Sequence, residues 1–269
     1  MNNVELYQKY NRLQAHDAVK FLDEYTKKLH WKEGATVMDI GCGDGKVTAT
    51  VLKKYLPART KVVGSDISER MVNYANKTYA SEDIEFVLLD IEGNLPEQMR
   101  GQFQQAFSFY ALQWPEKHDV VYSNIYNMLA DEGECVLMFL GYLSFYDALR
   151  KLAKSSRWSP YMQNLEKFLS PYHSCQDPGK EIKRLMYKIG FTDVEVKYKP
   201  KTFLYNSAEE KMKSLSAVNA MTIPNELFDE YMEEVMHELC RIDRLNRDVD
   251  PSLAMQTLYY NVIYVYAKK

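Results

Sequence analysis

Three glycines that follow a short apolar run are the residues best suited to chemistry in this chain. The run Val37–Ile40 encloses one acid, Asp39. The alternate positions that come next are occupied by Gly41, Gly43 and Gly45. Glycine adopts positive φ without strain and lets the backbone approach a ligand closely. Because apolar residues at helical spacing follow, the segment predicts a strand, a tight turn and a helix whose N-terminus faces a nucleotide-like group.

A second acid stands where such a ligand would need one. Asp66 ends an apolar run and comes 21 residues after Gly45. A carboxylate there can accept hydrogen bonds from a ribose diol bound over the glycine turn. The alternative is that Asp66 caps the next helix, although Ser68 would serve that purpose better. Met71 either covers the adenine face or is an ordinary core methionine.

A third acid, Asp90, follows the next apolar run. Its carboxylate can accept from an adenine amino group while Ile91 donates through its backbone; the alternative for Asp90 is a cap. Asp39, Asp66 and Asp90 thus fall at or near the ends of three consecutive predicted strands. Parallel strands bind ligands at their carboxyl ends, so the three acids predict one site.

The glycine spacing narrows the identity of the ligand. D-x-G-x-G-x-G, with an acid before the glycines, differs from the dinucleotide pattern G-x-G-x-x-G. It resembles the S-adenosylmethionine (SAM) loop of class I methyltransferases. The resemblance implies contacts with this cofactor by Asp39, Gly41, Cys42 and Gly43. An NAD-dependent oxidoreductase is the competing interpretation, and both the spacing and Asp90 argue against it.

The segment Ala106–Pro115 follows the fourth predicted strand and would face the reacting sulfonium. Backbone around Ser108 could hold the methionine amino group. Gln113 and Trp114 supply an amide and an indole N–H, which are neutral donors. Neutral donors suit a carboxylate that must stay nucleophilic, and a carboxylate is already ionised at pH 7. Methyl transfer would then rest on alignment and exclusion of water. The alternative for Trp114 is core packing.

The elements that must position these residues alternate along the chain. An amphipathic helix is predicted over 15–29. Strands are predicted at Val37–Ile40, Val62–Ser65, Ile84–Leu89, Gln105–Phe109, Cys135–Leu140, Val194–Tyr198 and Leu258–Ala267. Most are continuously apolar, as in parallel strands that are covered on both faces. The pattern predicts an α/β fold, a doubly wound, seven-stranded, mostly parallel, Rossmann-like sheet.

Two insertions interrupt this pattern, at about 142–190 and 206–250. Both follow strand ends and are rich in aromatic and apolar residues. We expect one methyltransferase domain, residues 1–269, with a helical cap formed by the insertions. The alternative is that the additional helices simply cover the sheet.

Composition limits the other possibilities. The chain has 269 residues and a net charge of −3, so no strong field would steer it to nucleic acid or an acidic membrane. Its four cysteines form no C-x-x-C pair, which argues against a metal site and favours the reduced cytoplasm. The first residues are too polar for a signal peptide, and no apolar run is long enough to span a membrane.

The chain resembles the insect juvenile hormone acid methyltransferases over essentially its full length. The matching segments are Met1–Asn3, Leu6–Tyr7, Asn11, Leu13–Gln14, Asp39–Gly43, Asp66–Ser68, Asp90–Gly93, Phe107–Tyr110, Phe139–Gly141 and Ser170–His173. The last is specific to the family, whereas the glycine loop is shared by all class I methyltransferases. The resemblance implies SAM-dependent methylation of the carboxyl group of farnesoic or juvenile hormone acids. It also implies that Gln14 and Trp114 donate to the substrate carboxylate, where Gln14 would otherwise be read as a solvated helix-start residue.

One position departs from the family pattern, which has a histidine before the tryptophan where this chain has Gln113. Glutamine can donate like imidazole but carries no charge near pH 7. His173 is another possible polar contact from the cap, or a capping or packing residue. Two alternatives stay open: a carboxyl methyltransferase for another aliphatic acid, and a SAM-binding copy with weak or no turnover.

Overall fold

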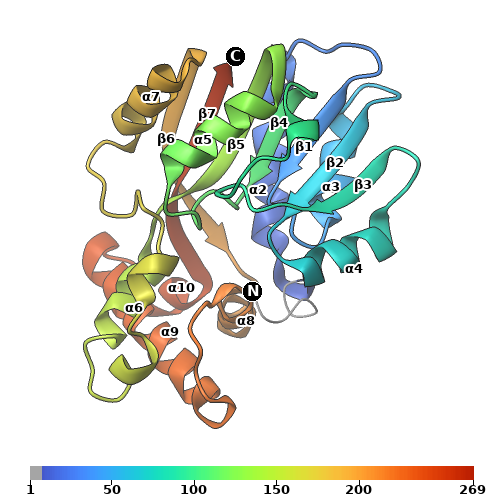
Figure 1. Cartoon of the computed structure of the whole chain (residues 1–269). Coiled ribbons are helices and arrows are strands. Elements are labelled where there is room, and N and C mark those ends of the chain that lie inside the picture. The colour runs from blue at the N-terminus through green and yellow to red at the C-terminus, as the bar shows by residue number, and fades with distance from the viewer. Residues whose placement is uncertain (1–7) are drawn as a thin grey trace. The chain divides into compact units, whose positions relative to one another are not determined.

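The computed structural model describes residues 8–269 (Figure 1). The contacts between residues divide the chain into two compact units. Residues 1–7, which carry part of the family resemblance, lie outside the described residues. The sheet unit comprises Arg12–Phe139, Cys175–Lys199 and Ile263–Lys269. The helical unit comprises residues 8–11 of the described chain, Leu140–Ser174 and Pro200–Val262. All of the predicted cofactor residues belong to the sheet unit.

The sheet has seven strands in the order β3-β2-β1-β4-β5-β7-β6. Their bounds are β1 Thr36–Ile40, β2 Lys61–Asp66, β3 Ile84–Leu88, β4 Phe103–Phe109, β5 Leu129–Leu143, β6 Thr192–Leu204 and β7 Thr257–Lys268. β1 pairs in parallel with β2 and β4, β2 with β3, and β4 with β5. The chain moves outward from β1 to β3 and then returns to the other side of β1, which confirms the doubly wound, mostly parallel sheet.

The central strand β1 explains why the predicted sheet forms. Val37, Met38 and Ile40 are buried, because helices cover both faces of the parallel strand. Ile40, the last residue of β1, pairs with Ser65 of β2 and with Ser108 of β4. The carboxyl ends of the three strands therefore lie side by side, directly before the glycine turn.

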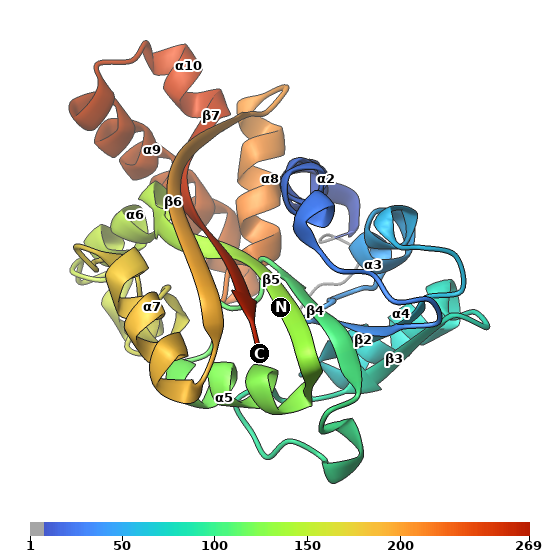
Figure 2. The ribbon, with the colours of Figure 1, turned by 90° about the horizontal axis from the view of Figure 1, so that it is seen from above.

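The helices of the sheet unit lie on its two faces. Figure 2 shows α2 and α3 on one face and α5 and α7 on the other. Their bounds are α2 Arg12–Tyr25, α3 Lys46–Thr50, α4 Glu69–Tyr79, α5 His118–Met128 and α7 Pro178–Ile189, with short 3-10 helices at Thr26–Lys28, Leu52–Tyr55 and Glu97–Met99. The helix predicted over 15–29 is thus α2 and the 3-10 turn that follows it.

The helical unit contains α6 Ser144–Leu152, α8 Ala208–Val218, α9 Asn225–Arg247 and α10 Pro251–Gln256, with 3-10 helices at Ser159–Tyr161 and Leu165–Phe168. α9 packs against both α6 and α10. The buried indole of Trp158 donates to Glu234 of α9 at 2.7 Å. The buried ammonium of Lys211 donates to the carbonyls of Ala254 and Thr257 at 2.9 and 2.7 Å. Apolar packing and satisfied polar groups together hold this unit.

Two strands, β5 and β6, extend furthest beyond their predicted bounds. Leu129 of β5 pairs with Phe103 before an irregularity in the register, and Glu134 pairs with Gln105 after it. The polar residues between Leu129 and Glu134 conceal the start of the strand. β6 is an edge strand, so it tolerates alternating charges and Pro200, which do not fit an apolar strand pattern.

The first insertion is shorter in the structure than about 142–190. α7, which lies within those bounds, belongs to the sheet unit and packs against α5. The helical segments outside the sheet unit are Leu140–Ser174 and Pro200–Val262. Their role as a cap stays a prediction.

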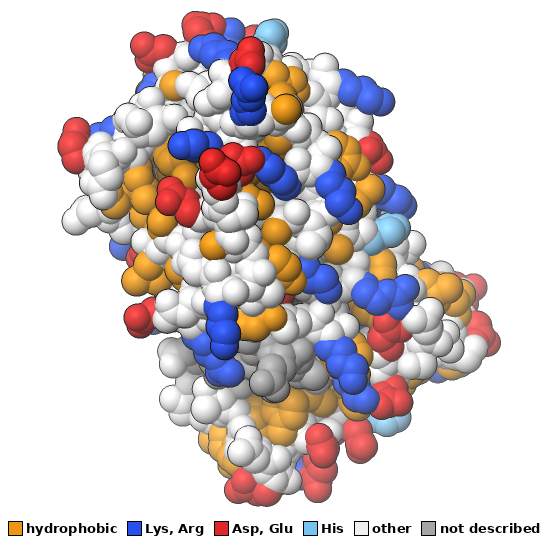
Figure 3. Space-filling view, turned by 90° about the vertical axis from the view of Figure 1, so that its right-hand side faces the viewer, with side chains coloured by type: hydrophobic (Ala, Val, Ile, Leu, Met, Phe, Trp, Pro, Cys, Tyr) orange, Lys and Arg blue, Asp and Glu red, His pale blue; other side chains and the backbone are white. Residues whose placement is uncertain are grey.

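The surface carries charges of both signs. Figure 3 shows Lys and Arg side chains interspersed with Asp and Glu on one face. Surface ion pairs such as Lys53–Asp83 at 3.3 Å and Arg59–Glu33 at 3.8 Å neutralise part of this charge locally. None of the helices in the described part of the chain is both long and apolar enough to cross a bilayer.

Candidate active site

The glycine turn has the backbone that its sequence predicts. Gly41, Gly43 and Gly45 have φ values of 72°, 56° and 78°. The N–H groups of Gly41 and Cys42 both donate to the carbonyl of Ser65, at 2.7 and 2.8 Å. A side chain at Gly41 would collide with Ala111, the second residue after β4. The turn therefore needs glycine for its conformation and for its close contact with the segment after β4.

Asp66, at the end of β2, is tied to the glycine turn. Its Oδ2 accepts from the N–H of Gly43 and its Oδ1 from the N–H of Ser68, both at 2.9 Å. Burial raises the pKa of this carboxyl above its ordinary value. Ser68 is the N-cap of α4 and accepts from the N–H of Met71 at 3.4 Å, so the capping role falls to Ser68 as expected. Ile67 is 68 % exposed, which leaves a large apolar side chain open beside Asp66.

One buried carboxylate, Asp39, lies just before the turn, and another, Asp44, lies within it. The hydroxyl of Thr48 donates to Oδ2 of Asp39 at 2.6 Å, and the N–H of Lys46 donates to Oδ1 of Asp44 at 3.1 Å. Asp39 Oδ1 and Asp44 Oδ2 are buried and have no hydrogen-bond partner within residues 8–269. Burial, helped by the charge of Asp66, raises the pKa of Asp39 from 3.8 to about 7. Sequence reasoning missed Asp44, although an acid between two glycines of the turn was a visible signal.

Asp90, Ile91 and Met71, which were also predicted to contact the cofactor, differ in exposure and in their hydrogen bonds. Asp90 is exposed, and its Oδ1 accepts from the N–H of Glu92 at 2.9 Å. The carbonyl of Ile91 accepts from the side chain of Asn124 at 2.8 Å. Met71 is fully buried in the core. Asp90 thus organises its own turn, and the burial of Met71 favours the core alternative.

Ser108 lies inside the sheet at the end of β4. Its side chain is fully buried, and its hydroxyl donates to the carbonyl of Ile40 at 2.8 Å. The hydroxyl thus links the ends of β1 and β4. A contact between the backbone near Ser108 and a cofactor stays a prediction.

The turn after β4 is organised around Tyr110, which sequence reasoning did not select. Tyr110 has a φ of 55°, a left-handed conformation that is uncommon for a bulky residue. Its N–H donates to the carbonyl of Met138, and its carbonyl accepts from Nε2 of Gln113, both at 2.7 Å. The N–H of Trp114 donates to the carbonyl of Ala111 at 3.1 Å. Hydrogen bonds within the turn and to β5 therefore support its backbone.

The side chains of Gln113 and Trp114 differ in burial and in hydrogen bonding. The side chain of Gln113 is only 3 % exposed and is engaged with the carbonyl of Tyr110. Trp114 is half-buried, and its indole N–H has no acceptor among the residues that the structure describes. The indole N–H is consequently the more available donor of the two.

Helix α2 carries Gln14 and is bonded to the same turn. Gln14 is half-buried, and its Oε1 is buried with no hydrogen-bond partner in the described chain. The hydroxyl of Tyr110 donates to Oδ2 of Asp17, three residues after Gln14. The structure therefore connects the helix of Gln14 with the turn of Trp114. Sequence reasoning missed Asp17 because a single acid in an amphipathic helix gives no sign of burial.

His173 belongs to the helical unit, where both ring nitrogens have partners. Its Nε2 lies 2.9 Å from Oδ1 of Asp147, and its Nδ1 accepts from the N–H of Leu143 at 3.4 Å. The ring stacks on Tyr142 with centroids 5.0 Å apart. These contacts are those of a capping and packing residue, and a role toward a substrate stays a prediction.

Comparison with known proteins agrees with this geometry. A family model described as a methyltransferase domain matches residues 37–133, from β1 into β5. The YcgJ protein of Bacillus subtilis has the same fold, with a TM-score of 0.63 and 14 % identity over 93 % of this chain and 98 % of that chain. At this identity the likeness concerns the fold alone.

Two curated relatives are much closer in sequence. Juvenile hormone acid O-methyltransferase of Bombyx mori is 40 % identical over 100 % of this chain and 98 % of its own length. The Drosophila melanogaster protein of the same name is 34 % identical over 87 % of this chain and 81 % of its own length. The resemblance seen in the sequence is thus confirmed. The chain belongs to the juvenile hormone acid O-methyltransferase family, within the class I SAM-dependent methyltransferases.

Proposed function

We propose that this protein methylates the carboxylate of a farnesoic or juvenile hormone-type acid, with SAM as methyl donor, to give the methyl ester. The observation that carries the proposal is the contact between Gly41 and Ala111. It brings the glycine turn against the turn that holds Trp114. Cofactor and acceptor groups would meet there, and the names of the two close relatives supply the acid class.

The residues around the glycine turn fit SAM. Bound SAM supplies a methyl group attached to a positively charged sulfur. Asp39 and Asp44 each keep a buried oxygen without a partner, so a donor or a cation that enters the turn would satisfy them. Asp66 would accept from the ribose hydroxyls, and Ile67 offers apolar contact to the adenine. Further contacts are proposed for Gly41, Cys42, Gly43, Asp90, Ile91 and the backbone of Ser108.

The acceptor carboxylate would be held by neutral donors. The indole N–H of Trp114 and the amide of Gln14 are the proposed direct contacts. Gln113 would act mainly on the turn, through the carbonyl of Tyr110. One carboxylate oxygen attacks the methyl carbon, and the electron pair of the broken C–S bond stays on sulfur. The products are the methyl ester and S-adenosylhomocysteine, and no proton has to move.

A transfer assay with labelled SAM and a panel of acids tests the substrate class. The panel contains farnesoic acid, a saturated fatty acid of similar length and a short polar acid. We expect the highest kcat/KM for farnesoic acid. Equal turnover of all three would remove the terpenoid assignment, and preference for the fatty acid would favour the alternative of another aliphatic acid.

A SAM-binding copy with little turnover is the second candidate, favoured by the engagement of Gln113 with Tyr110 in place of a family histidine. Calorimetry together with the transfer assay distinguishes the two candidates. The copy would bind SAM in calorimetry but yield no ester from any acid in the assay. We also propose a reducing, cytoplasmic location, because all four cysteines are free thiols and Cys42 and Cys135 are buried.

A further inference from the structure

We propose that the hydroxyl of Tyr110 and the carboxylate of Asp17 form a positioning pair for the acceptor site. The pair would hold helix α2 and the turn after β4 in one fixed arrangement. This inference rests on the proposed function, because its consequence is the alignment of Gln14 with Trp114. Tyr110 and Asp17 act through these donors and do not touch the reacting atoms.

Three groups of Tyr110 form hydrogen bonds with different parts of the sheet unit. Its N–H binds the carbonyl of Met138 in β5, and its carbonyl binds Gln113 within the turn. Its hydroxyl binds Asp17 in α2. A bulky residue with a φ of 55° persists only where its surroundings determine it strongly. The hydroxyl is the one group of the three that reaches the helix.

Asp17 has the burial expected of a fixed partner. Its side chain is fully buried in α2, and the ring of His16 lies 3.3 Å from its Oδ1. A buried carboxylate is costly unless donors satisfy it, so the bond from Tyr110 is strongly favoured. Asp17 comes three residues after Gln14, and residues at this spacing share a helix face. Fixing Asp17 therefore fixes the helical turn that carries Gln14.

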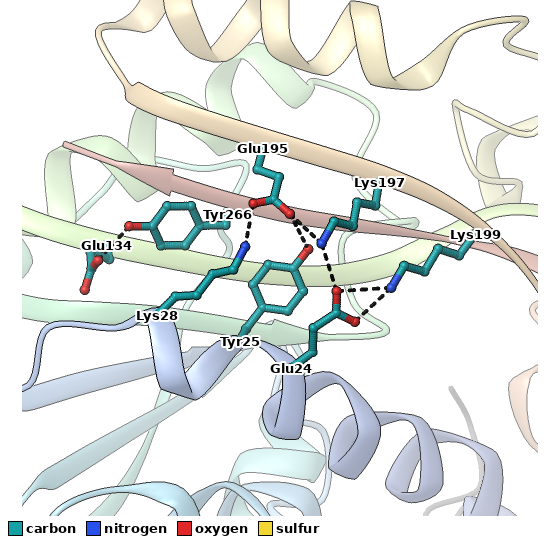
Figure 4. A network of polar contacts seen from close by, with 8 residues as sticks. All are labelled: Glu24, Tyr25, Lys28, Glu134, Glu195, Lys197, Lys199 and Tyr266. Atoms are coloured by element: carbon teal, nitrogen blue, oxygen red, sulfur yellow. Dashed lines mark hydrogen bonds and ion pairs between the residues drawn. The ribbon is translucent and has the colours of Figure 1, made fainter.

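The other end of α2 is held by contacts of a different kind. Figure 4 shows Glu24 and Tyr25 beside Glu195, Lys197 and Lys199 of β6. Glu24 accepts from Lys197 at 2.9 Å and from Lys199 at 2.8 Å. These half-exposed ion pairs are weak in water, and they lie two helical turns beyond Asp17. Glu24 is thus a matched control, being a hydrogen-bonded carboxylate on the same helix that lies away from Gln14.

The test compares Tyr110→Phe, Asp17→Asn, Asp17→Ala and Glu24→Gln, with farnesoic acid as substrate. Tyr110→Phe and Asp17→Ala should lower kcat/KM for the acid roughly 10- to 100-fold, because a small misplacement of positioned donors has effects of this size. The KM for SAM should stay unchanged. Asp17→Asn keeps an acceptor for the tyrosine hydroxyl and should recover most of the activity. Glu24→Gln should resemble the wild type.

A structural role alone would lower the melting temperature and the active fraction without changing the KM for the acid. The double variant Tyr110→Phe with Asp17→Leu removes the orphaned charge, so it should recover stability while acid kcat/KM stays low. Recovery of acid kcat/KM in this double variant overturns the proposal. A wild-type protein that methylates no acid overturns the proposed function and this inference with it. If the wild type methylates the acid and Tyr110→Phe has the same kcat/KM as Glu24→Gln, the inference alone is overturned.

Discussion

The backbone N–H of Gly43 donates to Oδ2 of Asp66 at 2.9 Å and so joins the glycine turn after β1 to the acid at the end of β2. This bond fixes the distance between two parts of the proposed cofactor site. It leaves the carboxylate with further lone pairs, because an ionised carboxylate can accept about four hydrogen bonds. Asp66 can therefore support the turn and bind a ribose at the same time.

Asp66→Ala should weaken SAM binding, because it removes charge-assisted bonds to the ribose that are worth ~1.5–3 kcal/mol. This corresponds to a roughly 10- to 100-fold rise in the dissociation constant, measured by calorimetry. Asp83→Ala is the control, because Asp83 is a surface acid paired with Lys53. Unchanged SAM affinity in folded Asp66→Ala protein would disprove the ribose placement.

Gly41→Ala should be far more destabilising than Gly34→Ala. Both glycines have positive φ, 72° and 70°, so both alanines carry a backbone strain of ~1–2 kcal/mol. Only the Gly41 variant also places its new methyl group against Ala111, whereas Gly34 has open space. Thermal unfolding measures the difference. Equal losses in melting temperature would mean that the contact between the two turns yields easily.

The sheet could be predicted from sequence because most of its strands contain a continuous apolar run. The positions of Asp39 and Asp66 could be predicted for the same reason, since they depend on where β1 and β2 end. The ends of β5 and β6 could not, because an irregular register and an edge position permit polar residues there.

The Asp17–Tyr110 bond is a different case. Its two residues are 93 positions apart and carry no motif, so only tertiary packing brings them together. The burial of Asp44 and the internal bond of Gln113 likewise depend on how the turns fold. Sequence patterns identify which segments form the site, and the side-chain partners within it follow from the fold.

Stability without SAM should fall as the pH rises between about 4 and about 7, because the folded protein holds the proton of Asp39. In the unfolded chain this carboxyl loses its proton near 3.8, whereas its folded pKa is about 7. The folded state therefore binds more protons in this window, and the free energy of unfolding decreases with pH. Denaturant unfolding of wild type and Asp39→Asn measures the effect. The variant should lack this part of the decrease, and identical pH profiles would contradict the raised pKa.

Gln14→Ala and Trp114→Phe should each reduce kcat/KM for the acid by removing a hydrogen bond to a charged group, worth ~1.5–3 kcal/mol. SAM affinity should stay nearly constant in both. Trp114→Phe keeps an aromatic ring and deletes the N–H, so it separates donation from packing. Lys20→Ala, at an exposed position of α2, is the control for helix mutation. Full turnover by Trp114→Phe would leave the indole a packing role only.

Gln113→His tests why this chain departs from the family pattern. If glutamine serves the turn through its bond to Tyr110, the histidine variant should show no rise in kcat and a small loss of stability, because the buried bond is lost. Steady-state kinetics and thermal unfolding measure the two effects. A large rise in kcat would instead identify the protein as a weakened copy of the family enzyme.

The most direct measurement of the central claim uses farnesoic acid with both carboxyl oxygens replaced by heavy oxygen, and SAM with a deuterated methyl group. Mass spectrometry of the product should show a methyl ester that carries the deuterated methyl and retains both heavy oxygens, because a carboxylate oxygen attacks the methyl carbon. An ester that has lost one heavy oxygen, or the absence of any deuterated ester while SAM binds, would contradict the account.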